Sequence, residues 1–274
     1  MKLGISIELY KMSELEEKVA AAAACGFKNC QMFLREVEVT EKNVGRVSEV
    51  CKSNGLKIGP VGAYANPLRP EVITMGCNMA KAKRIIELLP MFGSNEIAMW
   101  SGSYAEDVLA YSEGNYEKAA IQKLARTSEE ILKLLESVNG TLIFETYYTQ
   151  VLRDVSSVQA LLNLVKSDRL KVIIDPPNYI SPEEYPKRQE KMIELVDRLH
   201  TNIGAVHFKD FRLLEGGKWD YPGPGGGIMD YTLLMQKLKE HDYRSWGIIE
   251  HVTPAEYASA KSFVESHIIA VGAW

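Results

Sequence analysis

The sequence lacks the features that mark several large classes of protein. No apolar run approaches the roughly 20 residues needed to cross a membrane. The first residues, MKLGISIEL, are too short and too acidic at their end for a signal peptide. The four cysteines include no CxxC pair, which predicts small buried side chains in a reducing compartment and not a disulfide framework. We therefore expect a cytoplasmic protein that does not contact a membrane.

The sequence also lacks an excess of basic residues. Its 36 acidic and 32 basic residues give a formal net charge of −4, so we expect no nucleic-acid partner. Apolar residues make up 46% of the chain and charged residues 25%, which is the balance of an ordinary globular protein. A chain of 274 residues can bury a large core without disulfides, either as one domain or as two.

What the sequence does contain is an alternation of short apolar runs with longer amphipathic ones. The apolar runs predict eight strands, at residues 2–9, 29–34, 56–64, 95–100, 141–145, 171–175, 204–208 and 246–250. The amphipathic runs predict helices at residues 13–25, 40–52, 79–91, 116–138, 154–166, 184–200, 230–241 and 254–270. Eight such units without a break in composition predict an α/β fold with parallel strands and outer helices. We expect a closed (β/α)8 barrel, with residues 1–274 forming a single domain.

Two local patterns accompany this alternation. Ser13, with Glu16 three residues later, predicts a capping box that begins the first helix, and Gly26 predicts where that helix ends. The segment at 101–115, after the fourth strand, is a polar loop of unusual length.

Four predicted strands end in residues that could bind a metal ion. The runs TLIFE, KVIID and WGIIE are apolar until their last residues, Glu145, Asp175 and Glu250. The run VHFKD places His207 at the end of another strand. The intervals between the four residues are close to the length of one βα unit, so they belong to consecutive strands. In a barrel, the carboxyl ends of the strands meet at the face that carries the active site.

Three carboxylates and one imidazole form a ligand set suited to Mn²⁺, Co²⁺, Mg²⁺ or Zn²⁺. Without a cation, the three carboxylates would repel one another in a buried site. Each residue also has a structural interpretation when it is taken alone. A carboxylate at a strand end often caps a helix, Asp175 precedes Pro176-Pro177 in a turn, and His207 could be a core histidine. Their common phase on four strands favours one divalent metal site.

Several short motifs carry a resemblance that extends over most of the chain. They are GAYANPLRP at 62–70, FET at 144–146, DPPNY at 175–179, HFKD at 207–210, GPGGGIMDY at 223–231 and IIEH at 248–251. With these motifs the sequence resembles the xylose isomerase-like TIM-barrel superfamily, in its sugar phosphate isomerase/epimerase branch. The resemblance implies that Glu145, Asp175, His207 and Glu250 together bind one divalent metal ion.

The resemblance also implies a reaction. Its substrate would be a sugar or sugar phosphate, and its intermediate an enediolate stabilised by the metal. Glu145 and Glu250 are the implied catalytic acid and base: one removes the proton next to the carbonyl and the other returns a proton. Return to the same carbon on the opposite face gives epimerisation, and return to the neighbouring carbon gives isomerisation.

Five further residues are candidates for binding the substrate. Asn178 stands where many members of the superfamily have a histidine; an amide can bind a hydroxyl but cannot carry a proton. Lys209 and Arg212 could bind the intermediate or an anionic group, or could instead form salt bridges at the rim. Tyr64 and Trp100 end the third and fourth strands, where they either line the pocket or pack in the core.

Alternatives to the isomerase or epimerase remain open at this point. An inosose-type dehydratase would use the same site and expel a hydroxyl group. An AP endonuclease of DNA repair would need several metals and more histidines than the five present. A barrel that binds a ligand without catalysis would not need the metal ligands. The expected partner is a small carbohydrate, and a homo-oligomer is possible because relatives of this kind are often dimers or tetramers.

Overall fold

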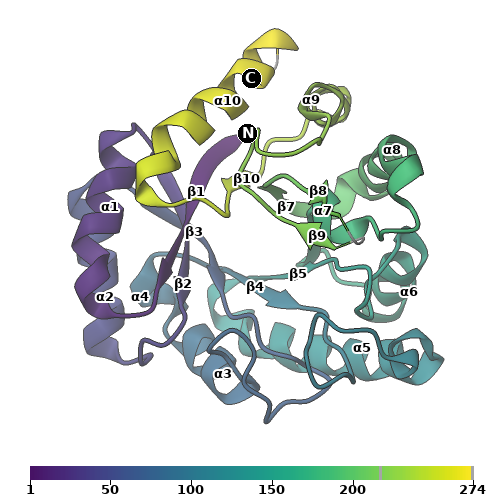
Figure 1. The fold of residues 1–274 in the computed structure, drawn as a ribbon. Helices are drawn as coiled ribbons and strands as arrows, with labels where there is room; N and C mark the ends of the chain where they lie inside the picture. The colour runs from purple at the N-terminus through teal and green to yellow at the C-terminus, as the bar shows by residue number, and fades with distance from the viewer. Residues whose placement is uncertain (216–217, 273–274) are drawn as a thin grey trace.

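The computed structural model describes residues 1–215 and 218–272, and in it eight parallel strands close into a barrel (Figure 1). These strands are β1 (Lys2–Leu9), β2 (Asn29–Leu34), β3 (Lys57–Gly62), β4 (Glu96–Trp100), β5 (Thr141–Glu145), β6 (Leu170–Ile174), β7 (Ile203–Phe208) and β10 (Trp246–Ile249). Neighbours in the barrel follow the chain order, and β1 closes the ring by pairing with both β2 and β10. The predicted (β/α)8 barrel is therefore confirmed.

Helices surround the strands, as Figure 1 shows. They are α1 (Leu15–Ala24), α2 (Glu41–Ser53), α3 (Met79–Glu87), α4 (Leu89–Phe92), α5 (Lys118–Leu134), α6 (Val155–Val165), α7 (Pro176–Tyr179), α8 (Arg188–Leu199), α9 (Tyr231–Glu240) and α10 (Tyr257–Ala270). Short 3-10 turns flank several of them, so the predicted helix at 116–138 is shorter and lies between two such turns. Within the described part of the chain, no helix has both the length and the apolar character needed to span a membrane.

The first helix begins differently from the prediction. Ser13 lies inside a 3-10 turn, Met12–Glu14, and α1 starts only at Leu15. The predicted capping box is wrong because Glu14 precedes the helix instead, and its carboxylate accepts hydrogen bonds from Lys18 Nζ (2.8 Å) and the Tyr10 amide (3.2 Å). The predicted end at Gly26 is confirmed, since this glycine has a φ of +78°.

The predicted helix at 79–91 is divided into α3 and α4. Leu88 ends the first and precedes the second, and Pro90 lies in the first turn of α4. Because proline has no N–H, it cannot continue the hydrogen-bond ladder of α3 but fits the first turn of a new helix.

The barrel interior is filled with large side chains at its amino end. Trp246, the first residue of β10, is buried there and its indole donates a hydrogen bond of 2.5 Å to Glu96 at the start of β4. Gly59 makes room for this ring, because a Cβ at that position would lie 3.0 Å from it. The cavity described below therefore opens at the opposite face, where the strands end.

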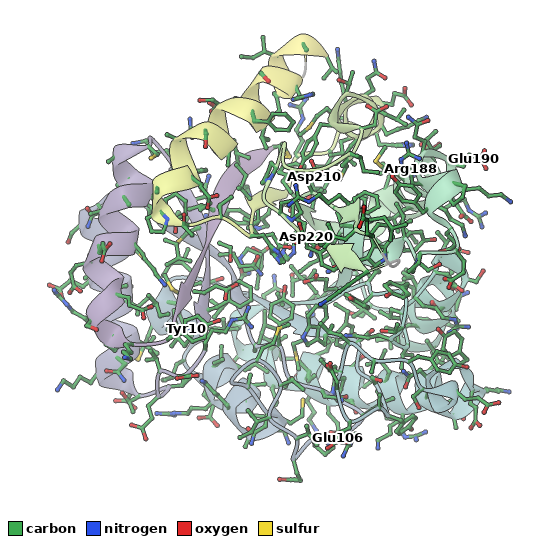
Figure 2. The ribbon with its side chains drawn as sticks, in the orientation of Figure 1. Tyr10, Glu106, Arg188, Glu190, Asp210 and Asp220 are labelled. Carbon is green, nitrogen blue, oxygen red and sulfur yellow. The ribbon has the colours of Figure 1, made fainter. Side chains whose placement is uncertain are left out.

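A small antiparallel hairpin follows β7 before the chain returns to the barrel. Its strands are β8 (Arg212–Leu213) and β9 (Trp219–Asp220). Figure 2 places Asp210 and Asp220 of this segment towards the centre of the view, whereas Arg188 and Glu190 lie at its edge. Asp210 fixes the glycine-rich part of the segment, because its carboxylate accepts hydrogen bonds from the backbone N–H groups of Phe211, Gly225 and Met229.

Candidate metal centre

The four residues predicted from strand ends converge on one point. Glu145 is the last residue of β5, Asp175 and Glu250 directly follow β6 and β10, and His207 is the next-to-last residue of β7. All four side chains are buried. Glu145, Asp175 and His207 each offer an atom within 4.8 Å of the other two, so this group could hold a metal ion.

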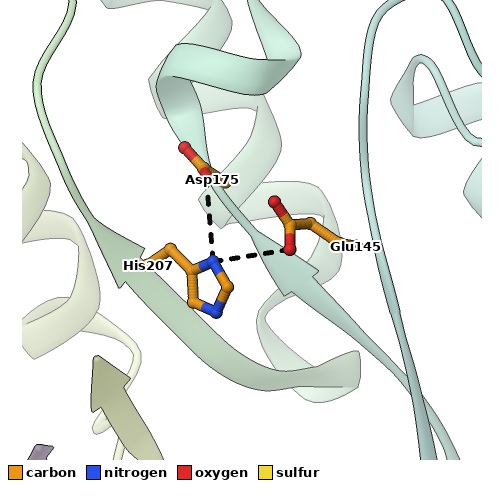
Figure 3. A group of neighbouring side chains, drawn as sticks. All are labelled: Glu145, Asp175 and His207. Atoms are coloured by element: carbon orange, nitrogen blue, oxygen red, sulfur yellow. Dashed lines mark ion pairs between the residues drawn. The ribbon is translucent and has the colours of Figure 1, made fainter. Parts of the chain in front are cut away.

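His207 lies at the centre of the group. Its Nδ1 is 3.1 Å from Glu250 Oε2, 3.5 Å from Glu145 Oε2 and 3.8 Å from Asp175 Oδ2. Figure 3 shows the imidazole between the carboxylates of Asp175 and Glu145. This buried Nδ1 has no hydrogen-bond partner among the described residues.

The other imidazole nitrogen has a partner that sets the tautomer. His207 Nε2 lies 3.0 Å from Gln31 Oε1, which can only accept, so Nε2 carries a proton. In the neutral ring, the lone pair is therefore on Nδ1 and faces the carboxylates. A hydrogen bond of this kind commonly orients a histidine that binds a metal. The donor set and its spacing fit a divalent cation.

Lys209 supplies a positive charge within this centre. Its Nζ lies 2.5 Å from Asp175 Oδ2 and 2.8 Å from Glu250 Oε1, and the side chain is only 4% exposed. Among the described residues, Lys209 thus pairs with buried carboxylates of the centre and not with a carboxylate at the rim. Lys209 partly offsets the repulsion among the buried carboxylates.

The electrostatics of the centre are dominated by these close charges. Burial alone would lower the pKa of His207, but the carboxylates of Glu250 and Glu145 raise it well above its usual value. Burial would raise the pKa of Glu250, yet His207 and Lys209 hold it well below its usual value. Burial raises the pKa of Asp175 in spite of Lys209. The positive charge of Lys209 and the raised pKa of His207 thus both follow from the negative charge of the buried carboxylates.

Glu145 is held by two of the predicted substrate residues. The Tyr64 hydroxyl donates a hydrogen bond of 2.7 Å to Glu145 Oε2, and Asn178 Nδ2 donates one of 2.6 Å to Glu145 Oε1. Burial would raise the pKa of Glu145, but the neighbouring His207 lowers it below its usual value. Asn178 therefore orients a carboxylate through an N–H group.

A wall of aromatic rings lines one side of the cavity above the centre. Phe33 stacks on Tyr64, with ring centroids 5.0 Å apart, and Trp100 meets Tyr64 edge-on at 4.9 Å. Tyr147 continues the wall at 5.9 Å from Trp100. The cavity holds about 490 Å³ of space when the open solvent at its mouth is included. Tyr64 and Trp100 line it, as do Asn178 and Lys209.

Arg212 takes a different position from the other predicted residues. Its guanidinium pairs with Asp220 across the hairpin at 2.8 Å, and its side chain is 52% exposed. Among the described residues, it is not part of the cavity lining. Of the two roles left open by the sequence, a salt bridge at the rim is the one present.

Sequence reasoning missed two residues of the site, Gln31 and Arg35. Gln31 is fully buried in the apolar strand NCQMFL, and an amide in such a strand is a signal that could have been noticed. Arg35 follows that strand and lines the cavity, but nothing local distinguishes it from an exposed arginine.

Comparisons with known proteins agree with this architecture. A family model described as "Xylose isomerase-like TIM barrel" matches residues 19–267. A D-tagatose 3-epimerase-like protein has a similar structure, with a TM-score of 0.77 and 19% identity, covering 99% of this chain and 98% of that one. An L-ribulose 3-epimerase superposes with a TM-score of 0.73 and 14% identity, over 98% and 95% of the two chains. At such identities, structural similarity shows the fold alone.

Curated relatives match over a shorter stretch. A 3-oxo-isoapionate decarboxylase of Pectobacterium atrosepticum is 29% identical over 140 residues, 47% of this chain and 48% of the relative. An inosose dehydratase of Halalkalibacterium halodurans is 24% identical over 162 residues, 51% of each chain. The chain thus spans about half the length of these relatives. Since the family model covers most of the sequence, the protein belongs to the xylose isomerase-like TIM barrel family.

Proposed function

We propose that this protein is a metal-dependent isomerase or epimerase of carbohydrates, with residues 1–274 acting as one domain. The observation that carries the proposal is the position of His207 Nδ1. It is buried, has no hydrogen-bond partner among the described residues and faces three carboxylates at 3.1–3.8 Å. A group of carboxylates around a lone pair is a ligand set, and it lies at the face of the barrel where active sites are found.

We assign the metal ligands as Glu145, Asp175, His207 and Glu250, and the ion as Mn²⁺, Co²⁺, Mg²⁺ or Zn²⁺. When bound, such an ion supplies a Lewis acid that polarises a substrate carbonyl group. The described residues contain one group of this kind, which supports a single metal ion and not the several metals of an AP endonuclease.

Glu145 and Glu250 carry the proton transfers in this proposal. They enter the centre from β5 and β10, which are separated in the ring by β6 and β7, and so reach a bound substrate from different sides. Both line the cavity. Asn178 and Tyr64 each donate a hydrogen bond to Glu145, so they orient its carboxylate. An amide cannot exchange a proton, so Asn178 does not act as acid or base. The two glutamates take those roles.

A dehydratase is the second candidate. The similarity to an inosose dehydratase over half the chain favours it, and the first step would be the same removal of a proton next to a carbonyl group. The reaction would then lose a hydroxyl group as water instead of returning a proton.

The test is turnover of the metal-loaded protein in D₂O, with ketoses, aldoses, their phosphates and inososes as substrates. NMR of the products separates the outcomes. An epimerase or isomerase places one deuterium on a retained carbon skeleton, a dehydratase forms a new alkene or methylene group, and a decarboxylase releases carbon dioxide. Protein treated with a chelator serves as the control and should regain activity with Mn²⁺. Turnover that is unchanged by chelation would contradict the proposal.

A further inference from the structure

Arg35 is held rigidly beside the cavity. It directly follows β2, its backbone N–H donates to the Leu9 carbonyl (2.9 Å), and its own carbonyl accepts from Lys81 Nζ (2.8 Å). Gly76 packs against this carbonyl so closely that a Cβ there would clash with it. The arginine therefore starts from a fixed backbone position.

The guanidinium group is fixed as well, except at one nitrogen. Its Nε and Nη2 each donate a hydrogen bond of 2.9 Å to the two oxygens of Glu8, and its plane lies over the Phe33 ring at 4.8 Å. The side chain is 12% exposed. Nη1 is buried and has no hydrogen-bond partner among the described residues. Leaving a charged donor unpaired is unfavourable, which suggests that a ligand completes the group.

The two charged residues of the pair face the same space. Glu8 and Arg35 both line the cavity that Glu145 and Glu250 line, and Phe33 connects the pair to Tyr64 and the metal centre. Each Glu8 oxygen accepts one hydrogen bond from Arg35 and keeps a second lone pair. The pair therefore combines a guanidinium whose Nη1 lacks a partner among the described residues with a carboxylate that can still accept, and both side chains line the cavity.

We propose that the Glu8–Arg35 pair is the subsite for the end of the substrate remote from the metal, and that it selects an unphosphorylated sugar or cyclitol. The inference rests on the proposed function. A hydroxyl group both accepts and donates, so it can use Nη1 and Glu8 together. A phosphate only accepts, and Glu8 repels its charge of about −1.5 to −2.

The net charge of the cavity also favours an unphosphorylated ligand. Lys209 and Arg35 supply the permanent positive charges among the described residues of the lining, and both are already paired with carboxylates. A bound divalent ion would balance the remaining carboxylate charge. A neutral polyol leaves that balance intact, whereas a phosphate would add an uncompensated negative charge in a buried site.

The subsite can be tested without turnover, by calorimetric titration of the Mn²⁺-loaded protein with unreactive ligands. Sorbitol, xylitol and myo-inositol are the neutral probes, and sorbitol 6-phosphate and gluconate are the charged ones. We expect at least one neutral probe to bind, and sorbitol 6-phosphate to bind about tenfold more weakly than sorbitol. Arg35→Met should weaken the neutral probes about tenfold. Glu8→Gln should narrow the gap between sorbitol and its phosphate, because the amide no longer repels the charge.

Arg212→Met is the matched control, since Arg212 pairs with an acidic residue outside the cavity lining. It should leave every affinity unchanged. If Arg35→Met does not fold, the Glu8→Gln variant still decides the question. The inference is overturned if no neutral probe binds, if the phosphate or gluconate binds as tightly as its neutral counterpart, or if Arg35→Met and Glu8→Gln both behave as wild type.

Kinetics separate this inference from the proposed function. With the substrate found in the D₂O panel, Arg35→Met should raise KM about tenfold and leave kcat within about threefold, because the pair binds far from the reacting carbon. Turnover with a KM independent of Arg35 would overturn the subsite and leave the function standing. If polyols bind in a way that depends on Arg35 but no substrate is turned over, the proposed function is overturned and the subsite stands.

Discussion

The two halves of the barrel end in different chemistry. Strands β2, β3 and β4 lead to an aromatic wall formed by Phe33, Tyr64 and Trp100. Strands β5, β6, β7 and β10 end in the candidate metal ligands, Glu145, Asp175, His207 and Glu250. The strands themselves are alike, with buried apolar residues throughout. The difference teaches that a few residues at the strand ends set the chemistry of each half, with aromatic rings in the first and carboxylates around one imidazole in the second.

Substitutions at the strand ends of the second half should give the largest loss of turnover. We expect Glu145→Gln and Glu250→Gln each to lower kcat by about 10²- to 10⁴-fold, because an amide cannot take up a proton. The measurement is steady-state turnover together with the rate of deuterium incorporation. Glu130→Gln, on the exposed face of α5, is the control and should behave as wild type. A wild-type rate in either cavity variant would remove that glutamate from the proton transfers.

Gln31, on β2 in the first half, contacts His207 of the candidate metal centre, and substitutions there sharpen the comparison. Gln31→Ala removes the acceptor that orients His207, so we expect metal affinity to fall about 10- to 100-fold. Gln31→Glu keeps an acceptor and should retain affinity closer to wild type. Titration with Mn²⁺ followed by electron paramagnetic resonance measures both. Equal affinities for all three proteins would show that the tautomer of His207 does not depend on Gln31.

The two halves touch where Tyr64 donates to Glu145. Tyr64→Phe keeps the ring stack and removes this hydrogen bond, so the aromatic wall should survive while Glu145 loses one of its two side-chain donors. We expect kcat to fall about tenfold with little change in KM, as for the loss of one hydrogen bond to a charged group. A change confined to KM would instead assign Tyr64 to substrate recognition.

The smallest effect, a change in thermal stability, is expected at the opposite end of the barrel, where Trp246 donates a hydrogen bond to Glu96. Burial raises the pKa of Glu96, so the folded protein binds a proton at this carboxyl more tightly than the unfolded chain. Such a group costs stability above its folded pKa, and the cost disappears as the pH falls below its unfolded pKa. Glu96→Gln, whose amide oxygen can still accept from the indole, should raise Tm by about 1–4 °C at pH 7.

The same substitution should make much less difference near about pH 4, where the wild-type carboxyl is mostly protonated in both states. Thermal unfolding followed by circular dichroism at both pH values tests this. A lower Tm at pH 7 would mean that the charged hydrogen bond to Trp246 outweighs the burial of Glu96. Activity should not change in either case.

The fold could be predicted from the sequence because its signals are local. Alternating apolar and amphipathic runs predicted all eight strands, and polar residues at strand ends predicted where Glu145, Asp175, His207 and Glu250 lie. Gln31 could not be found in this way, since its partner His207 is 176 residues away in the sequence. The partner of Arg35 is 27 residues away, on a neighbouring strand. The capping box at Ser13 failed because a competing local arrangement formed instead, in which Glu14 accepts hydrogen bonds from Lys18 and the Tyr10 amide, each four residues away.

The Lys209 ammonium has a consequence for the folded state itself. Its Nζ lies 2.5 Å from Asp175 and 2.8 Å from Glu250, where it offsets part of the negative charge of the buried carboxylates. The fold therefore contains a permanent counter-charge for these buried carboxylates.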